Sequence, residues 1–265
     1  MGCYFCFAEG DVPRLSKEHL LSKPVAEAFG LDRSAGFGQL SSTDDSVVLA
    51  QLDDVAVRFV CERCNNTWMN ALEHEMAALA AWAGPTDQSL TPTQIESLRA
   101  WSLKTYLVLS AMVGETRRFA KNPKAPGVIP NFTRARQLKE KDAQAFDGMA
   151  FGLARPDEPS RFAYAFGNPT VVPQGPRYAS RKSAGLAIVT LGALQVWVVD
   201  PTIFHAAKIS FPKRVIIPDP GLKYSVLRGM PVVPRLEDVV VDNGEHDIVE
   251  LIDRLNAWAR TRSSG

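Results

Sequence analysis

Two long stretches of the chain repeat apolar residues every three or four positions, which is the spacing of one face of an α-helix. The first spans residues 64–83 and stops at Gly84-Pro85. Its apolar positions are Trp68, Leu72, Met76, Leu79 and Ala83. The second begins at residues 91–94 with the capping sequence T-P-T-Q and reaches about Val113. It is apolar around most of its girth, which predicts a buried helix in which Lys104 snorkels toward solvent.

Shorter runs of apolar or alternating residues predict β-strands, and clusters of Gly, Ser, Thr and Asp predict loops. In the first part of the chain we expect a loop over residues 32–46 and strands over 47–50 and 55–60. In the last part, the predicted strands are 149–154, 161–166, 185–190, 194–199, 207–211 and 215–217, with a hairpin turn at 191–193. Short helices are predicted at 24–30 and 132–142, and a final amphipathic helix at 248–258.

All four cysteines of the chain fall in two C-x-x-C pairs, Cys3 with Cys6 and Cys61 with Cys64. Two thiolates at this spacing can bind one metal ion, and four complete the closed tetrahedral shell of a structural zinc site. The alternatives are two disulfides or a redox-active pair. A disulfide framework suits a small secreted domain, whereas this chain has 265 residues and no secretory signal at its start. We therefore expect structural Zn²⁺ in a reducing, cytoplasmic setting.

Further candidate ligands lie close to the cysteine pairs in the sequence. Glu18-His19 is located between the two pairs, and Asn65-Asn66 directly follows the last cysteine. Carboxylate and amide oxygens suit a hard cation such as Mg²⁺, while histidine ionises near neutral pH and can act as a general base. If zinc draws both cysteine pairs together, these groups can converge on one phosphate.

The C-x-x-C pair, the E-H after a short strand and the C-x-x-C-N-N-x-W on a helix together resemble the HNH endonucleases of the His-Me finger (ββα-metal) class. The resemblance is to the branch with a four-cysteine zinc site and covers about residues 1–84. It implies that His19 activates water and that Glu18 and Asn65 hold a catalytic Mg²⁺ or Mn²⁺. It also implies a phage, mobile-element or host-defence setting.

The chain departs from the family signature at one position. The central asparagine of the signature, which braces the loop carrying the histidine, has no counterpart, because no asparagine occurs between Leu20 and Arg63. We therefore expect Asp53, Asp54 or a backbone carbonyl to orient His19.

The net charge is only +1, so nucleic-acid binding would have to use a local patch rather than overall charge. Residues 115–141 form the most basic window. The candidate phosphate-binding residues are Arg117, Arg118, Lys121, Lys124, Arg134 and Arg136 in this window, and Lys17 and Lys23 beside the Glu-His pair. A solvated surface is the alternative reading. With the nuclease-like start of the chain, we favour contacts with DNA phosphates, and RNA is not excluded.

Together these patterns predict an α+β protein in three parts. Residues 1–84 would form a zinc-stapled, HNH-like ββα-metal module, residues 85–145 a helical and basic segment, and residues 146–265 an antiparallel β-rich domain ending in a helix. No apolar run approaches the roughly 18 residues of a membrane span. The leading function is metal-dependent hydrolysis of DNA phosphodiester bonds. The alternatives are a non-catalytic, zinc-stabilised nucleic-acid-binding module, and an interaction or substrate-sensing protein that works through its C-terminal sheet.

Overall fold

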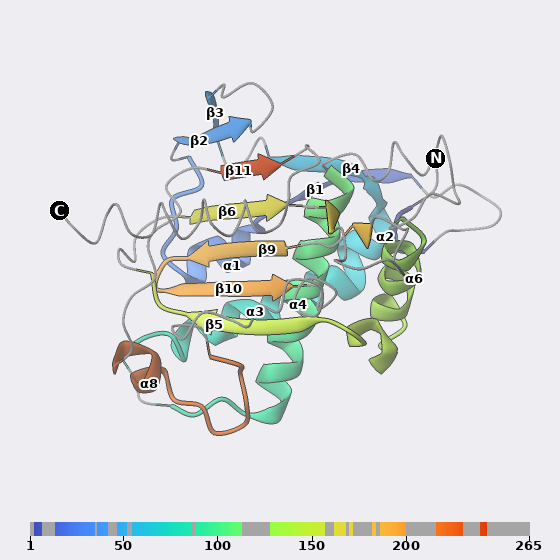
Figure 1. The fold of residues 1–265 in the computed structure, drawn as a ribbon. Helices are drawn as coiled ribbons and strands as arrows, with labels where there is room; N and C mark the ends of the chain where they lie inside the picture. The colour runs from blue at the N-terminus through green and yellow to red at the C-terminus, as the bar shows by residue number, and fades with distance from the viewer. Residues whose placement is uncertain are drawn as a thin grey trace.

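The structure, a computed structural model, combines helices with one large and two small sheets (Figure 1). The described residues are 3–6, 14–34, 36–41, 47–51, 55–85, 88–112, 128–156, 162–167, 170–171, 182–183, 186–199, 216–229 and 239–242. The strand predicted at 207–211 and the helix predicted at 248–258 lie outside them. Within the described residues, no helix is both long enough and apolar enough to cross a membrane.

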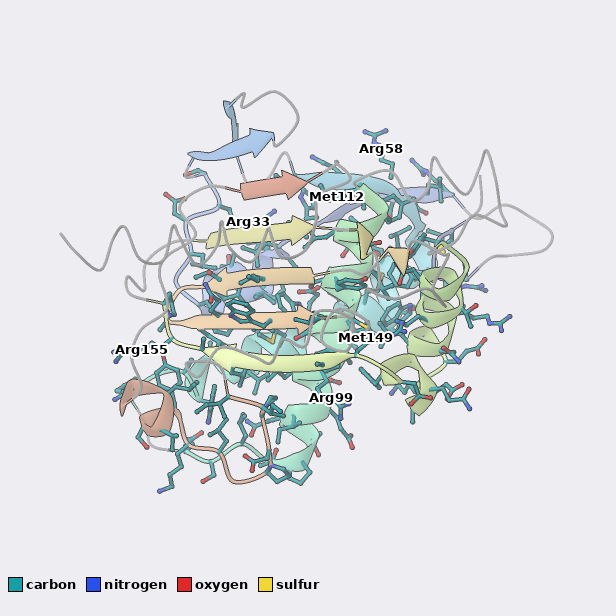
Figure 2. All side chains as sticks on the ribbon, viewed as in Figure 1. Arg33, Arg58, Arg99, Met112, Met149 and Arg155 are labelled. Carbon is teal, nitrogen blue, oxygen red and sulfur yellow. The ribbon has the colours of Figure 1, made fainter. Side chains whose placement is uncertain are left out.

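The N-terminal part has a strand–strand–helix arrangement. Strand β1 (Leu15–His19) pairs antiparallel with β4 (Ala56–Cys61), and an irregularity in the pairing falls between Ser16 and Glu18. A short helix, α1 (Lys23–Ala28), follows β1 and has proline in its first turn, as predicted. On β4 the side chains alternate, with Val57 and Phe59 buried and Arg58 pointing outward (Figure 2). This alternation places one face of β4 against the core.

The helical run that leaves β4 is continuous but not uniform. It passes through α2 (Glu62–Cys64), the π-helical turn η2 (Asn65–Met69), α3 (Asn70–Ala78) and the 3₁₀ turn η3 (Leu79–Ala81). The buried face includes Met69, Leu72, Met76 and Leu79, and Glu73 lies among them. A π-helical turn inserts an extra residue into the helix and often occurs at functional sites. Here it follows directly after the second cysteine pair.

Among the described residues, the large sheet has seven strands in the order β3-β2-β11-β6-β9-β10-β5. The bounds are β2 (Gly36–Ser41), β3 (Val47–Gln51), β5 (Ala150–Ala154), β6 (Phe162–Gly167), β9 (Leu186–Leu191), β10 (Leu194–Val199) and β11 (Val239–Asp242). The β9–β10 hairpin forms as predicted, with Gly192 at φ 55° in its turn. The two-stranded sheet of β7 (Thr170–Val171) and β8 (Lys182–Ser183) is separate.

Two features of the large sheet differ from the sequence prediction. Strand β11 runs parallel to both of its neighbours, β2 and β6, so the sheet is mixed and not purely antiparallel. Residues 36–41, predicted to be a loop, form β2, because backbone pairing with β3 and β11 outweighs the weak strand preference of their glycines. Strands from the first fifth of the chain therefore share a sheet with strands from its second half.

Helix α4 (Pro92–Ser110) is the central element of the fold. It begins with the predicted capping box, in which Thr91 and Gln94 exchange side-chain to backbone hydrogen bonds, and residues 101–110 are all buried. It packs against α3 on one side and against β6, β9 and β10 on another (Figure 1). At the surface, the guanidinium of Arg99 lies 5.0 Å from the ring centre of Phe146 (Figure 2). Helix α4 thus joins the N-terminal part to the sheet.

Two further segments complete the described structure. Helix α6 (Val128–Lys139) begins earlier than the predicted 132–142 helix and packs against α4 and the 3₁₀ turn η5 (Ala143–Phe146). Near the C-terminal side, α8 (Tyr224–Gly229) packs on Trp82, whose ring centre lies 5.2 Å from that of Tyr224. The indole N–H of Trp82 donates to the Leu222 carbonyl at 3.0 Å. Residue 216 makes an isolated bridge to β5 where a strand was predicted at 215–217.

Candidate functional site

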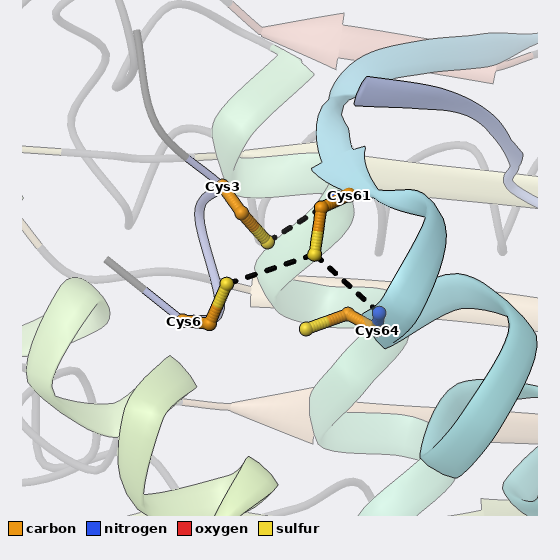
Figure 3. Close-up of side chains that lie close together, drawn as sticks. All are labelled: Cys3, Cys6, Cys61 and Cys64. Carbon is orange, nitrogen blue, oxygen red and sulfur yellow. Dashed lines mark hydrogen bonds between the residues drawn. The ribbon is translucent and has the colours of Figure 1, made fainter. Parts of the chain in front are cut away.

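The four cysteine side chains converge on one point, as their spacing predicts (Figure 3). Their sulfur atoms all lie within 4.8 Å of one another, and the Cys6 and Cys61 sulfurs are 3.6 Å apart. Zinc–sulfur bonds of about 2.3 Å place the sulfurs of a tetrahedral site about 3.8 Å apart. The four thiols therefore fit a metal ion such as zinc. Among the described residues, no other group of three or more His, Cys, Asp or Glu side chains gathers in this way.

Hydrogen bonds from backbone N–H groups hold the two distant cysteine pairs in this cluster. The N–H of Tyr4 donates to the Phe59 carbonyl at 2.8 Å, which holds the first knuckle against β4. The N–H of Cys61 donates to the Cys3 sulfur at 3.3 Å, and the N–H of Cys64 donates to the Cys61 sulfur at 3.4 Å. Such N–H groups stabilise thiolates, which are the form that binds a metal.

Three of the cysteine thiols, Cys3, Cys6 and Cys64, differ in how readily they ionise. The hydrogen bond from the Cys64 thiol lowers the pKa of Cys3 to about 4, against the effect of burial. Burial raises the pKa of Cys6 to about 11, and the hydrogen bond to Cys3 together with burial raises the pKa of Cys64. The Cys3 thiol is thus readily ionised, while the thiols of Cys6 and Cys64 keep their protons. A bound cation would displace those protons, so metal affinity should fall as the pH is lowered.

The Glu-His pair and Asn65 lie on adjacent elements. His19 is the last residue of β1, is half-buried, and sits opposite Ala56 of β4. Asn65 begins the π-helical turn, and its amide nitrogen donates to the Ser16 hydroxyl at 3.0 Å and to the Lys17 carbonyl at 3.2 Å. The side chain of Asn65 therefore fastens the start of the helix to the strand that carries His19. Asp53 and Asp54, the two side chains that we expect to orient His19, lie outside the described residues.

Glu18 is engaged in a buried ionic cluster. The residue is only 5% exposed, and its carboxylate accepts a hydrogen bond from the Lys104 ammonium at 3.0 Å. Lys104, on α4, is fully buried and also hydrogen-bonds to the carboxylate of Glu73 on α3. Glu73 in turn accepts from the Ser22 hydroxyl at 2.6 Å and from the Trp101 indole N–H at 2.9 Å. We call these five residues the Lys104 cluster.

The charges of the cluster depend on one another. Burial alone would lower the pKa of Lys104, but the carboxylates of Glu73 and Glu18 together raise it above its ordinary value, so the ammonium stays charged. Burial raises the pKa of Glu18; the Lys104 ammonium opposes this rise and the Glu73 carboxylate adds to it. Lys104 is thus the positive charge that allows two carboxyl groups to be buried together.

The prediction that Lys104 snorkels to solvent is wrong, because the two carboxylates meet it inside the protein. A signal for this was present in the sequence. Lys104 lies in a helix that is apolar on nearly all sides, and Glu73 lies on the apolar face of the preceding helix. Charged residues on buried faces are rare unless they are paired, so two opposite charges in such positions favour a contact.

The described members of the expected phosphate-binding set lie on three elements, β1, α1 and α6. Lys17 and Lys23 are exposed, and Lys23 lies 3.6 Å from Glu27. Arg134 donates to the Asp147 carbonyl at 3.1 Å and so helps to hold its own chain, while exposed Arg136 lies 4.0 Å from Glu140. The remaining four candidates, Arg117, Arg118, Lys121 and Lys124, lie outside the described residues.

Comparison with known proteins leaves the site to be interpreted from its own geometry. No protein-family model, no curated protein and no solved structure matches this chain. The observations that bear on function are therefore the four-cysteine cluster, the strand end that carries His19, and the ionic cluster behind it.

Proposed function

We propose that this chain is a zinc-stabilised nuclease of the HNH type that hydrolyses phosphodiester bonds in DNA, with His19 as the general base. The observation that supports it best is the strand–strand–helix arrangement around His19. Strand β1 ends in Glu18-His19, β4 runs antiparallel to it, and the helix after β4 begins with the second cysteine pair. Asn65 then bonds back to β1.

The chemistry assigned to His19 is proton removal from water. The half-buried imidazole would accept a proton as the water oxygen forms its bond to phosphorus. The bond from phosphorus to the 3′ oxygen breaks, and that oxygen leaves on the opposite side and takes a proton from solvent. A positioned base of this kind typically contributes about 10²–10⁴-fold in rate. When bound by Cys3, Cys6, Cys61 and Cys64, zinc would supply folding free energy to the unit that presents His19.

A catalytic Mg²⁺ or Mn²⁺ held by Glu18 and Asn65, as the resemblance implies, does not fit the surroundings of Glu18. The Glu18 carboxylate is buried against the Lys104 ammonium. We therefore assign no step of the proposed reaction to an ion at this position.

The test is cleavage of supercoiled plasmid by wild type, His19→Ala and His74→Ala, with and without added Mg²⁺ or Mn²⁺. His74 is the matched control because it is an exposed histidine on the helix that follows the site. We expect His19→Ala to lose about 10²–10⁴-fold in rate, and His74→Ala to cleave like wild type. Zinc content and circular dichroism should match across the three proteins. Equal cleavage by wild type and His19→Ala would overturn the proposal.

The second candidate is a zinc-stabilised module that binds nucleic acid without cleaving it. It is favoured by the engagement of Glu18 with Lys104, which leaves the acidic partner of His19 away from solvent. A salt-sensitive gel shift without cleavage under any divalent ion would support it. Replacing Arg117, Arg118, Lys121 and Lys124 together by alanine should then weaken binding and flatten its salt dependence, since fewer counterions are released.

A further inference from the structure

The Lys104 cluster joins three parts of the chain that are far apart in the sequence. Glu18 of β1 and Ser22 just before α1 belong to the first, Glu73 of α3 to the second, and Trp101 and Lys104 of α4 to the third. Lys104 lies 86 positions after Glu18 and 31 after Glu73. The cluster is therefore a tertiary junction at the centre of the N-terminal part.

The cluster holds the chain on both sides of His19. One residue before it, Glu18 is bound to Lys104, and three residues after it, the Ser22 hydroxyl is bound to Glu73. Ser22 occupies the cap position of α1, but its side chain makes no cap hydrogen bond and turns to Glu73 instead. His19 is thus carried on a short segment with both ends fixed to the same buried group of charges.

The ammonium of Lys104 occupies the place where a cation would meet Glu18. Its nitrogen has three N–H donors and gives hydrogen bonds to both Glu18 and Glu73. A divalent ion bound to the Glu18 carboxylate on this side would have to occupy the same space as the ammonium and pair with the same carboxylates. Since buried like charges repel strongly, the ammonium and a divalent ion exclude one another there.

We propose that the Lys104 ammonium takes the position beside Glu18 that the resemblance to HNH nucleases assigns to a divalent metal ion. Glu18 is then a positioning residue, which holds the segment that carries His19. The effect of Glu18 on catalysis by His19 rests on the proposed function, whereas the exclusion of a metal ion from Glu18 does not. The structural zinc site is separate from this exclusion, because its ligands are the four cysteines.

The first test measures Mn²⁺ binding by isothermal titration calorimetry to zinc-loaded wild type and Glu18→Gln. Glutamine keeps the shape of the side chain and an oxygen that can accept from Lys104, but it is a poor ligand for Mn²⁺. We expect the two proteins to bind Mn²⁺ alike, which includes the case in which neither binds it. Loss of a ligand should weaken binding by at least about tenfold. A loss of that size in Glu18→Gln would overturn the inference.

The second test removes the ammonium. In Lys104→Met, the two carboxylates lose their shared cation, so added Mn²⁺ should raise the melting temperature of this variant. It should not raise that of wild type, and Lys104→Met combined with Glu18→Gln should respond less than Lys104→Met alone. If Mn²⁺ stabilises wild type through Glu18, or fails to stabilise a folded Lys104→Met, the inference is overturned. Should Lys104→Met not fold, the comparison of wild type with Glu18→Gln still decides it.

A third measurement separates this inference from the proposed function. For a nuclease, Glu18→Gln should lower kcat more than KM, and excess Mg²⁺ or Mn²⁺ should not restore the rate, as it would for a weakened metal ligand. Restoration of the rate by excess metal would overturn the inference and leave the nuclease proposal intact. Conversely, if wild type cleaves nothing but the Mn²⁺ measurements come out as expected, the nuclease proposal fails and the role of Lys104 stands.

Discussion

Replacement of Lys104 by methionine should strongly destabilise the protein. Methionine has nearly the same length and keeps the apolar contacts of the lysine stem, so the main change is loss of the ammonium. That ammonium is fully buried and has two carboxylate partners, Glu18 and Glu73. Without it, these two acidic groups remain in the interior and lose the cation that they share.

The expected size of this effect follows from the geometry. Two unit charges at the 3.0 Å distance between the Lys104 nitrogen and a Glu18 oxygen attract each other by roughly 5 kcal/mol at an effective dielectric constant of about 20. Desolvation of the charges offsets part of this attraction in the wild-type protein. Removal of one partner of a buried pair leaves the other uncompensated and typically costs about 3–5 kcal/mol. We expect Lys104→Met to fall in that range at pH 8.

The loss in free energy of unfolding caused by Lys104→Met, called the deficit below, should also depend on pH. Burial already raises the pKa of Glu18, and the Lys104 ammonium opposes that rise; its removal should raise the pKa further. An acid whose pKa is higher in the folded state makes folding less favourable as the pH rises from its ordinary value, 4.5 for glutamate, through the folded value. The deficit of Lys104→Met should therefore be smallest at pH 5 and grow toward pH 8. In wild type, the raised pKa of Lys104 keeps its contribution intact below the ordinary lysine value of 10.5.

Urea unfolding of the zinc-loaded proteins at pH 5, 6.5 and 8 measures both effects. Lys23→Met is the matched control, because Lys23 forms an exposed pair with Glu27 at 3.6 Å and such pairs contribute little. It should unfold like wild type at every pH. A deficit for Lys104→Met below about 1 kcal/mol, or one that does not change with pH, would refute the ionic role assigned to Lys104.

Three further predictions concern neighbouring features. Purified protein should contain about one zinc ion per chain, and Cys61→Ser should lose both the zinc and the folded N-terminal part; metal-free wild type that is fully folded would contradict this. Asn65→Ala should keep its zinc but lose the hydrogen bonds to β1, so plasmid cleavage should slow with little change in KM. Trp101→Phe should remove the indole donor to Glu73 and cost about 1–3 kcal/mol in urea unfolding, and an unchanged midpoint would show that Glu73 finds another donor.

Features with a local signal could be predicted from the sequence. The capping box at Thr91 and Gln94 formed, because its residues are neighbours in the chain. The hairpin turn at Gly192 formed for the same reason. The four-cysteine cluster was predictable although its halves are far apart, because C-x-x-C pairs specify how each half is built and what must join them.

Features that depend on long-range pairing could not be predicted. Nothing local to residues 36–41 or 239–242 indicates that β2 and β11 pair in parallel, because parallel pairing depends on the path of the intervening chain. The partner of Glu18 was missed for a related reason. The side chains of Glu18 and His19 are the same whether the cation beside the carboxylate is a metal ion or a lysine from another helix.

The identity of that cation therefore depends on α4 and not on the residues that carry the resemblance to HNH nucleases. Every residue of that resemblance lies within residues 1–84, yet the charge that neutralises Glu18 and Glu73 comes from Lys104, beyond that boundary. Two proteins could share the cysteine pairs and the Glu-His pair and still differ at this point. With lysine on α4, the glutamate anchors the strand that ends in His19; with an apolar residue there, the same glutamate would be available to a metal ion. In proteins that share these motifs, the residue at the position of Lys104 should thus show whether the glutamate pairs with lysine or is available to a metal ion. The Glu-His pair itself distinguishes these two kinds of site less sharply.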